Sequence, residues 1–159
     1  MSVINPIILT LDAGGTNFVF SSMQNGEIIS DTVSLPASTK SEASCTATII
    51  EGFETLKTNI KQPISAISFA FPGPADYNYG IIGNLPNFPG INGNYPLKTV
   101  LEEHFNCPCF INNDGDLFAY GEALAGILPE INAALKAAGN TKKFSNLIGV
   151  TLGTGIGSG

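Results

Sequence analysis

The sequence predicts an α/β domain built on one mixed sheet, in which an antiparallel β-meander and parallel strands are flanked by helices. Two observations support this prediction. In the first 35 residues, apolar runs with strand-like alternation are separated by tight turn signals, which is typical of antiparallel strands. After residue 40, segments with helical spacing of apolar residues alternate with short apolar strands, which favours strands joined by helices in an α/β arrangement.

The meander occupies the N-terminal segment. Residues 7–11 alternate and are rich in side chains that fit a pleated surface, and residues 18–22 are predicted to return from them after a glycine-containing tip. An Asn-Gly pair at residues 25–26 is a strong two-residue turn signal. Residues 27–35 are therefore predicted to form a third strand.

The first helix is predicted from a capping pattern and an apolar face. Thr39 with Glu42 three residues later has the form of a capping box, which favours a helix start there. Apolar residues at spacings of three and four then predict a helix to about residue 61, with one face made of Ala43, Ala47, Ile50, Phe53, Leu56 and Ile60. Gly52 lies inside this helix and costs about 1 kcal/mol relative to Ala.

The rest of the chain alternates strands and helices. Strands are predicted at residues 64–71, 109–111 and 147–152, the last of them buried. Helices are predicted at residues 97–105, 117–125 and 130–138. Residues 72–96 are dense in Pro, Gly, Asn and aromatic side chains, which predicts a long ordered loop with a short hairpin through residues 80–82.

Composition bounds the class of protein. The chain has 159 residues, of which 43% are hydrophobic and 13% charged, so it is globular with a real core. Its formal net charge is −6, from 7 basic and 13 acidic residues, which argues against nucleic acid or an anionic membrane as a partner. No apolar run approaches the roughly 20 residues of a membrane span, and the N-terminus lacks the basic region of a signal peptide. We therefore expect a cytoplasmic protein.

The three cysteines are odd in number, so they do not form a closed disulfide framework. His104, Cys107 and Cys109 lie close together in the sequence and are candidate metal ligands. Their spacing falls short of the paired spacings of structural zinc sites, and Cys45 is far away. We favour buried thiols at the start of a strand over a metal site.

The first turn also carries the chemistry of a ligand site. Gly14 and Gly15 lack Cβ atoms, so backbone amides at this tip can approach an anion, and Thr16 and Asn17 add polar side chains. A carboxylate beside a phosphate is repulsive unless a cation lies between them, so Asp12 suggests a Mg²⁺-assisted nucleotide site. Taken alone, a strand-Asp-Gly-Gly-strand pattern is more often ordinary hairpin chemistry.

Two further segments are candidates for binding a polar ligand. The amide-rich loop at residues 72–96 follows a central strand, where sugars and other polar ligands bind in open α/β sheets, although it could also be a surface excursion. Asp114 falls where a strand stops and a helix begins, which suits a general base, but position alone favours a helix cap by about two to one. Asn113 beside it can donate and accept hydrogen bonds, as a hydroxyl-rich ligand requires.

The end of the chain repeats the pattern of the first turn. Residues 150–155 repeat the pattern of residues 9–14. In both segments an apolar residue, Thr and Leu are followed by a glycine-rich turn, which suggests an internal duplication. Two such loops could clamp the phosphates of a nucleotide through backbone amides and the threonine hydroxyls. Asp12 would then lie near the metal and Asp114 could take a proton from an attacking hydroxyl, and these are the parts that phosphoryl transfer requires.

These segments resemble the motifs of the ROK family of sugar kinases and repressors, within the actin-like ATPase superfamily. Residues 12–17 are similar to its first phosphate motif and residues 153–157 to its second. Asn113-Asp114 with Gly121-Glu122 resembles the segment that holds the catalytic aspartate. Pro72-Gly73-Pro74 and Asn84-Leu85 are similar to the sugar-contacting loop. The match covers essentially the whole chain, with its motifs in the expected order.

The resemblance implies a ribonuclease H-like, actin-like ATPase lobe that binds MgATP and a hexose. Asp114 would be the base that deprotonates a sugar hydroxyl. The implied sugar-binding residues are Asn113, Gly73, Pro74, Asn84 and Glu122. The implied phosphate-binding residues are Asp12, Gly14, Gly15, Thr16, Asn17, Gly153, Thr154, Gly155 and Gly157, with Asp12 also holding Mg²⁺ through water. The acceptor would be glucose, an N-acetylhexosamine or fructose.

The sequence departs from the family in length. Family members are roughly twice as long, and their second lobe supplies a Glu-Gly-His segment, a cysteine-rich zinc site and the adenine pocket, none of which is present here. We therefore expect residues 1–145 to be the N-terminal lobe and residues 146–159 to be the first strand and phosphate loop of a second lobe, with no strand returning from that loop. Such a lobe is predicted to be inactive alone and to self-associate through its exposed strand at residues 147–152.

Two other functions remain open at this point. A sugar-sensing regulator of the same family would carry a basic helix-turn-helix ahead of the first phosphate motif, and only eleven residues precede Asp12, which argues against it. A noncatalytic sugar-binding or interaction fragment is the other alternative.

Overall fold

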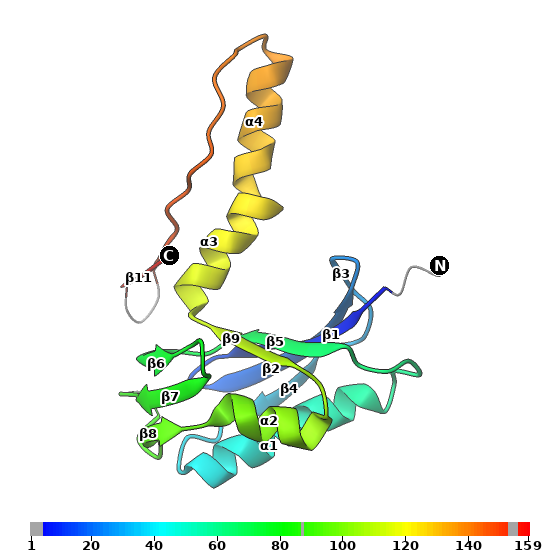
Figure 1. Ribbon diagram of the computed structural model, residues 1–159, viewed down its shortest axis with the longest axis vertical. Helices are drawn as coiled ribbons and strands as arrows, with labels where there is room; N and C mark the ends of the chain where they lie inside the picture. Colours follow the sequence, from blue (N-terminus) through cyan, green and yellow to red (C-terminus); the bar gives the residue numbers. More distant parts are fainter. Residues whose placement is uncertain (1–4, 87, 153–155) are drawn as a thin grey trace. The chain divides into compact units, whose positions relative to one another are not determined.

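The computed structural model describes residues 5–86, 88–152 and 156–159. The chain forms two compact units, residues 1–112 and residues 113–159, each described separately below (Figure 1). The division into residues 1–145 and 146–159 stays a prediction. Within the described residues, no helix is both long and apolar enough to cross a membrane. The cytoplasmic location also stays a prediction.

The first unit is built on the predicted mixed sheet. Its central strand, β1 (Ile7–Ala13), pairs antiparallel with β2 (Asn17–Gln24) and parallel with β5 (Ala66–Ala70). On the far side of β5 lies β9 (Cys109–Asn112), again parallel. The antiparallel pair and the parallel strands confirm the predicted fold class.

The predicted third strand is interrupted, so the prediction of one strand at residues 27–35 was wrong. β3 (Glu27–Ile28) and β4 (Val33–Pro36) both pair antiparallel with β2, at opposite ends of it. Between them, the hydroxyl of buried Ser22 donates to the hydroxyl of Ser30 at 2.7 Å. A polar side chain on the departing segment therefore satisfies a buried hydroxyl, an arrangement that strand periodicity does not reveal.

Helix α1 (Glu42–Lys57) confirms the predicted helix but not its boundaries. Its cap is Ser41, not Thr39: Ser44 N donates to Ser41 Oγ at 3.1 Å, and Ser41 N donates to Ser44 Oγ at 3.2 Å. The helix ends at Lys57 instead of residue 61. The buried side consists of Cys45, Ile49, Gly52, Phe53 and Leu56, whereas Ala43 and Ala47 of the predicted face are exposed.

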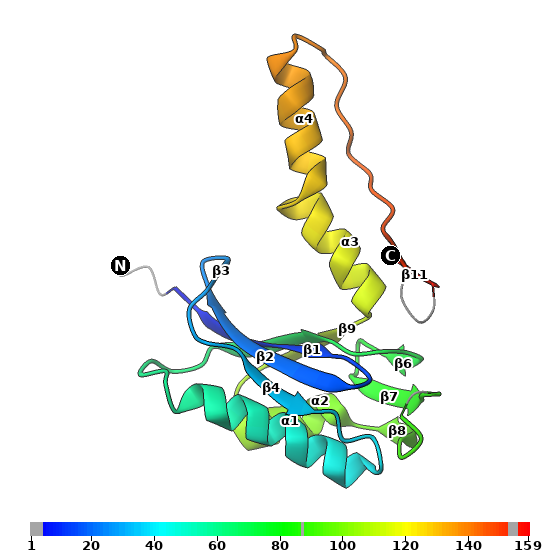
Figure 2. The same cartoon turned by 180° about the vertical axis from the view of Figure 1, so that it is seen from behind.

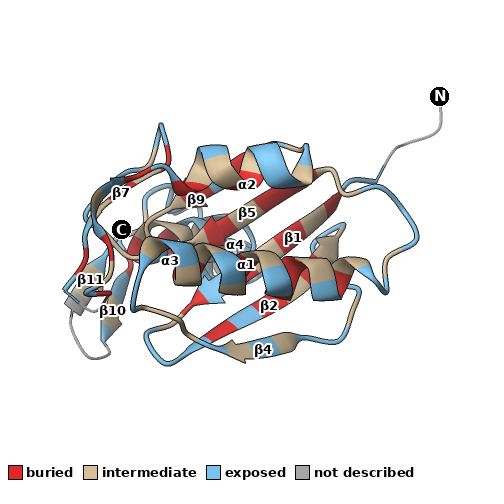
Figure 3. Cartoon of the chain, turned by 90° about the horizontal axis from the view of Figure 1, so that it is seen from below, coloured by how far each residue is buried: buried red, intermediate tan, exposed pale blue. Residues whose placement is uncertain are grey.

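The core of the first unit lies between the sheet and its two helices. Figures 1 and 2 show α1 and α2 (Leu97–Phe105) on the same face of the sheet, and Figure 3 shows buried residues along the strands beneath them. The helix predicted at residues 97–105 is thus confirmed. Aromatic rings fill this layer, contributed by Phe18, Phe20, Phe53, Phe69, Phe71 and Phe88. Burial of rings of this size supplies much of the hydrophobic stabilisation.

Residues 72–96 form a small sheet of their own. The predicted hairpin is present as β6 (Ala75–Asp76) and β7 (Ile81–Asn84), and β7 also pairs with β8 (Asn92–Tyr95). The segment is therefore more regular than the long loop that composition predicted. Ile82 and Tyr95, which face each other in the register, are buried and anchor this sheet to the core.

The second unit contains two helices and a terminal hairpin. Helix α3 (Asp114–Leu124) begins three residues before the predicted start at 117, and α4 (Ile127–Ala137) begins before the predicted start at 130. β10 (Val150–Leu152) pairs antiparallel with β11 (Ile156–Ser158).

Two expectations about this terminal hairpin were wrong. A strand, β11, does return from the second glycine-rich turn. The strand predicted at residues 147–152 is the shorter β10, and it is not buried in this chain, since Val150 is 55% and Leu152 80% exposed. Self-association through this strand stays a prediction.

Candidate functional site

The ends of three parallel strands meet at one edge of the main sheet. The register pairs Asp12 with Ala70 and Ala70 with Asn112, so β1, β5 and β9 end level with one another. Along β1 the buried residues alternate with less buried ones, and Asp12 is exposed. This is the edge at which ligands bind in open α/β sheets. The exposed carboxylate of Asp12 therefore lies at the expected position for a ligand site.

The first glycine turn forms the predicted hairpin tip between β1 and β2. Ala13 pairs with Phe18, which leaves the tip at residues 14–17. A Cβ on Gly14 would lie 2.9 Å from the backbone oxygen of Asn17, whereas one on Gly15 would meet nothing within 4 Å. Gly14 is thus required by close packing of the backbone, and Gly15 leaves open space in which a ligand could approach. The phosphate-binding role of this tip stays a prediction.

Asn113 caps helix α3 and Asp114 is its first residue. The Oδ1 of Asn113 accepts from Gly115 N at 2.8 Å and from Asp116 N at 3.4 Å. Position in the sequence favoured Asp114 as the helix cap, but the residue that caps α3 is its neighbour Asn113. The Asp114 side chain is exposed and accepts from Gly115 N at 2.9 Å, close to the positive end of the helix.

Replacing Asn113 with Ala is expected to lower the free energy of unfolding of the second unit by about 1 kcal/mol, because two helix amides lose their acceptor. Asn113→Asp is the matched variant, since Asp caps helices as well as Asn does, and it should keep most of that stability. Urea denaturation followed by circular dichroism measures both variants. An equal loss in the two would contradict the capping role.

The predicted sugar-contacting residues of the first unit lie together in the small sheet. Gly73 and Pro74 directly precede β6, and Gly83 N donates to the Pro74 oxygen at 2.8 Å, which brings Asn84 close to them. A Cβ on Gly83 would lie 2.7 Å from that oxygen. Gly83 is therefore required for this geometry. Gly83 was not among the predicted site residues, although a glycine within an apolar strand is a signal of close backbone approach.

Glu122 has a structural partner within the second unit. Its Oε2 accepts from Ile127 N at 2.8 Å, so the side chain on α3 caps the start of α4. A Cβ on Gly126 would lie 2.4 Å from the same oxygen and 2.9 Å from the Cα of Glu122, so the backbone of α3 also favours glycine at this junction. The substrate-binding role of Glu122 stays a prediction beside this capping role.

The second glycine turn lies between β10 and β11, as the first lies between β1 and β2. Gly153, Thr154 and Gly155 fall outside the described residues, and Gly157 pairs with Thr151 in the hairpin. A Cβ on Gly157 would lie 2.6 Å from Thr151 Oγ1, so this strand passes closely over the threonine. The flanking strands support the echo between the two turns. Their phosphate-binding roles stay predictions.

The cysteines behave as core residues. Cys45 and Cys109 are fully buried, which raises the pKa of each thiol to about 12, and Cys109 begins β9 as predicted. His104 Nε2 lies 3.2 Å from Glu54 Oε1. The hydrogen bond from the Lys57 ammonium is the main cause of the lowered pKa of Glu54, and the contact with His104 lowers this pKa further. Among the described residues, no three His, Cys, Asp or Glu side chains are grouped as a metal site.

Comparison with known proteins decides the family. The sequence model of the ROK family matches residues 8–159 of this chain. The chain belongs to the ROK family. This membership confirms the resemblance found in the sequence motifs.

Relatives within the ROK family include kinases and repressors. A fructokinase of Pediococcus pentosaceus is 32% identical over 155 residues, which cover 94% of this chain and 46% of the fructokinase. A xylose repressor of Bacillus spizizenii is 30% identical over 112 residues, which cover 70% of this chain and 25% of the repressor.

The crystal structure of a glucokinase from Parabacteroides distasonis shares this ROK fold. It superposes with a TM-score of 0.87 at 57% identity, covering 97% of this chain and 43% of the glucokinase. This chain thus spans about half the length of the kinases that it matches.

Proposed function

We propose that this chain is the N-terminal lobe of a kinase that transfers the γ-phosphoryl group of ATP to a hydroxyl of a hexose, with glucose, an N-acetylhexosamine or fructose as acceptor. The observation that carries the proposal is the register that aligns Asp12 with Asn112, two residues before Asp114. The proposed metal carboxylate and the segment leading to the proposed base thus share one sheet edge. The fructokinase and glucokinase relatives support the same chemistry.

The nucleotide is proposed to bind at the two glycine turns. Amides of Gly14 and Gly15 and the side chains of Thr16 and Asn17 would donate to phosphate oxygens, together with the turn at residues 153–157. The Asp12 carboxylate suits Mg²⁺, which prefers oxygen ligands, and would hold the ion through water. When bound, this ion neutralises charge that develops on the phosphate oxygens.

Asp114 is the proposed general base. Its carboxylate takes the proton of the attacking hydroxyl, whose oxygen forms a bond to the γ-phosphorus while the bond from that phosphorus to the ADP oxygen breaks. Asp114 is the first residue of α3, and its exposed side chain lies at the N-terminal end of that helix. Neighbouring hydroxyls would be held by Asn113, Glu122, Gly73, Pro74 and Asn84.

A coupled assay of ADP release tests the proposal. The complete gene product, as defined by the coding sequence downstream of Gly159, is expected to turn over at least one of glucose, N-acetylglucosamine and fructose with ATP and Mg²⁺, and to lose this activity when EDTA removes the metal. Absence of turnover with every hexose would contradict the kinase. The 159-residue chain alone is expected to be nearly inactive, and normal turnover by it would contradict its assignment as one lobe.

The second candidate function is a sugar-sensing regulator. The similarity to a xylose repressor over 112 residues favours it, since this relative shares the same part of the fold. A regulator would bind a sugar without turning it over. Calorimetry of the same hexoses, run beside the coupled assay, separates the two, because binding without ADP release is the result expected of a regulator.

A further inference from the structure

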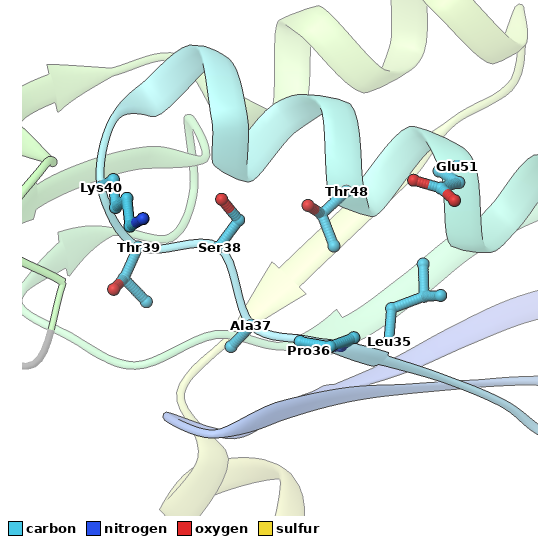
Figure 4. A pocket seen from close by; sticks show the side chains of 8 residues that line it. All are labelled: Leu35, Pro36, Ala37, Ser38, Thr39, Lys40, Thr48 and Glu51. Atoms are coloured by element: carbon cyan, nitrogen blue, oxygen red, sulfur yellow. The ribbon is translucent and has the colours of Figure 1, made fainter.

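A cavity of about 450 Å³ lies in the first unit, and none of the proposed sugar- and phosphate-binding residues lines it. Residues 35–40, at the end of β4 and in the loop after it, form one wall, and Thr48 and Glu51 on α1 form the other (Figure 4). Its volume falls within the range of small-molecule sites, roughly 300–1,000 Å³. No role in the proposed phosphoryl transfer has been given to these residues.

The two ends of the cavity carry opposite charges. Figure 4 shows the Lys40 ammonium at one end and the Glu51 carboxylate at the other, with the hydroxyls of Ser38 and Thr48 between them. Neither charged group forms an ion pair with another described residue. Leu35 adds an apolar surface. An ammonium attracts an anion, whereas hydroxyls and a carboxylate accept hydrogen bonds from hydroxyl groups.

We propose that this cavity binds a small hydroxyl-rich anion, either a sugar phosphate or a sugar acid. The anionic group binds Lys40, and the hydroxyls at the other end of the ligand donate to Glu51 and contact Ser38 and Thr48. The separation of the two charges keeps the anion away from the Glu51 carboxylate. Thr48 Oγ1 already donates to Ser44 O at 3.1 Å, so it offers a ligand an acceptor oxygen, as the Ser38 hydroxyl also can. A ligand with hydroxyls along its length can donate to both oxygens, whereas the carbon chain of an amino acid cannot.

The cavity loop also connects to both proposed ligand-binding segments. On one side Ala37 N donates to the backbone oxygen of Thr16 at 2.8 Å, in the tip between β1 and β2. On the other side Gly90 N donates to the Thr39 oxygen at 3.0 Å, and a Cβ on Gly90 would lie 2.1 Å from the carbonyl carbon of Lys40. A ligand bound to Lys40 therefore restrains the segment on which the proposed phosphate tip rests. This regulatory consequence rests on the proposed function, whereas the binding site does not.

Titration of the ¹⁵N-labelled chain with glucose 6-phosphate, followed by two-dimensional NMR, tests the site. Amides of residues 38–41 and 48–51 are expected to shift and to saturate. Lys40→Gln should weaken binding at least about tenfold because a charge-assisted contact is lost, and Glu51→Gln should weaken it by a smaller factor. Lys61→Gln removes a charge from an exposed residue outside the cavity and should leave the affinity unchanged.

Three further ligands define the chemistry that the cavity accepts. Gluconate in place of glucose 6-phosphate shows whether a carboxylate serves as well as a phosphate, and saturable binding of either one supports the site. Inorganic phosphate and glucose, which each lack one half of the ligand, should bind more weakly than the better of these two. Inorganic phosphate binding as tightly as glucose 6-phosphate would overturn the role of the hydroxyls.

Two results would overturn the site itself. One is unchanged affinity in Lys40→Gln, whose spectrum also reports whether the variant is folded. The other is amide shifts confined to residues 12–17 and 112–116, which would assign the ligand to the proposed active site. The coupled assay tests the proposed kinase activity by ADP release, whereas the titration measures binding to the cavity. A negative result in the assay therefore does not change the interpretation of the titration.

Discussion

Replacing Asp114 with Asn is expected to lower the kcat for hexose phosphorylation by about a thousandfold, with the KM for the sugar changed by a small factor. A positioned general base contributes about 10²–10⁴ to a rate, and an amide cannot accept the proton of the sugar hydroxyl. Asn keeps the size of the side chain and an oxygen that can accept from Gly115 N, as Asp114 Oδ1 does at 2.9 Å. The helix start should therefore survive. The measurement is the coupled assay on the complete gene product.

Asp116→Asn is the matched control for this prediction. Asp116 lies in the same first turn of α3, so its substitution removes the same charge near the same helix end. The proposed chemistry assigns it no proton transfer, and its kcat is expected to stay close to that of the parent. A similar loss in both variants would mean that charge at the helix end matters and would contradict a general base at Asp114. Retention of kcat within tenfold in Asp114→Asn would contradict it directly.

The sequence predicted the central strands of the fold because their signal is local. The alternation in β1 and β2 and the apolar run of β5 follow from burial of one or both strand faces, and an Asn-Gly turn marks the end of β2. The missed features depend on contacts from elsewhere in the chain. Ser30 leaves the strand ladder to meet Ser22, and Thr39 is held by Gly90 in the loop before β8 instead of capping α1. Thr39 and Gly90 are too far apart for one window of sequence to contain both, and the contact of Ser22 with Ser30, although close in sequence, does not follow the strand period.

The candidate site was predictable in its parts and less so in its arrangement. A glycine turn after an apolar strand identified the first hairpin, whereas the second glycine turn was recognised without its returning strand, β11. The strand-to-helix junction identified Asn113 and Asp114. Which of these two residues caps the helix depended on backbone geometry, since both types are good caps. The contact of Glu122 with Ile127 N needed the start of α4, whose predicted position was three residues too late.

Replacing Gly52 with Ala is expected to lower the free energy of unfolding of the first unit by about 2 kcal/mol. Helix propensity alone gives the opposite sign, because Ala is better than Gly by about 1 kcal/mol inside a helix. In the structure a Cβ on Gly52 would lie 2.3 Å from the Cε2 and Cζ atoms of Phe20. Overpacking of a dense core costs about 1–3 kcal/mol and sometimes more, which exceeds the gain in propensity.

The Phe20 ring cannot easily move aside to accept the new methyl group. It is fully buried, and its centroid lies 5.1 Å from that of Phe53 and 6.5 Å from that of Phe18, in edge contacts with both. Urea denaturation followed by circular dichroism measures the loss. Gly121→Ala is the control, since Gly121 lies inside α3 with nothing within 4 Å of its Cβ position, and it should gain up to about 1 kcal/mol.

A double variant separates the steric cause from other effects of the Gly52 substitution. Phe20→Leu removes the atoms that the new Cβ would meet, so Gly52→Ala should cost less in that background than in the parent chain. Because the two side chains are in contact, the coupling free energy is expected to be about 1 kcal/mol or more. If Gly52→Ala costs the same in both backgrounds, or stabilises the parent as Gly121→Ala does, then Gly52 is not retained for packing against Phe20. The glycine would then be a simple weakness of α1, as its local sequence predicts.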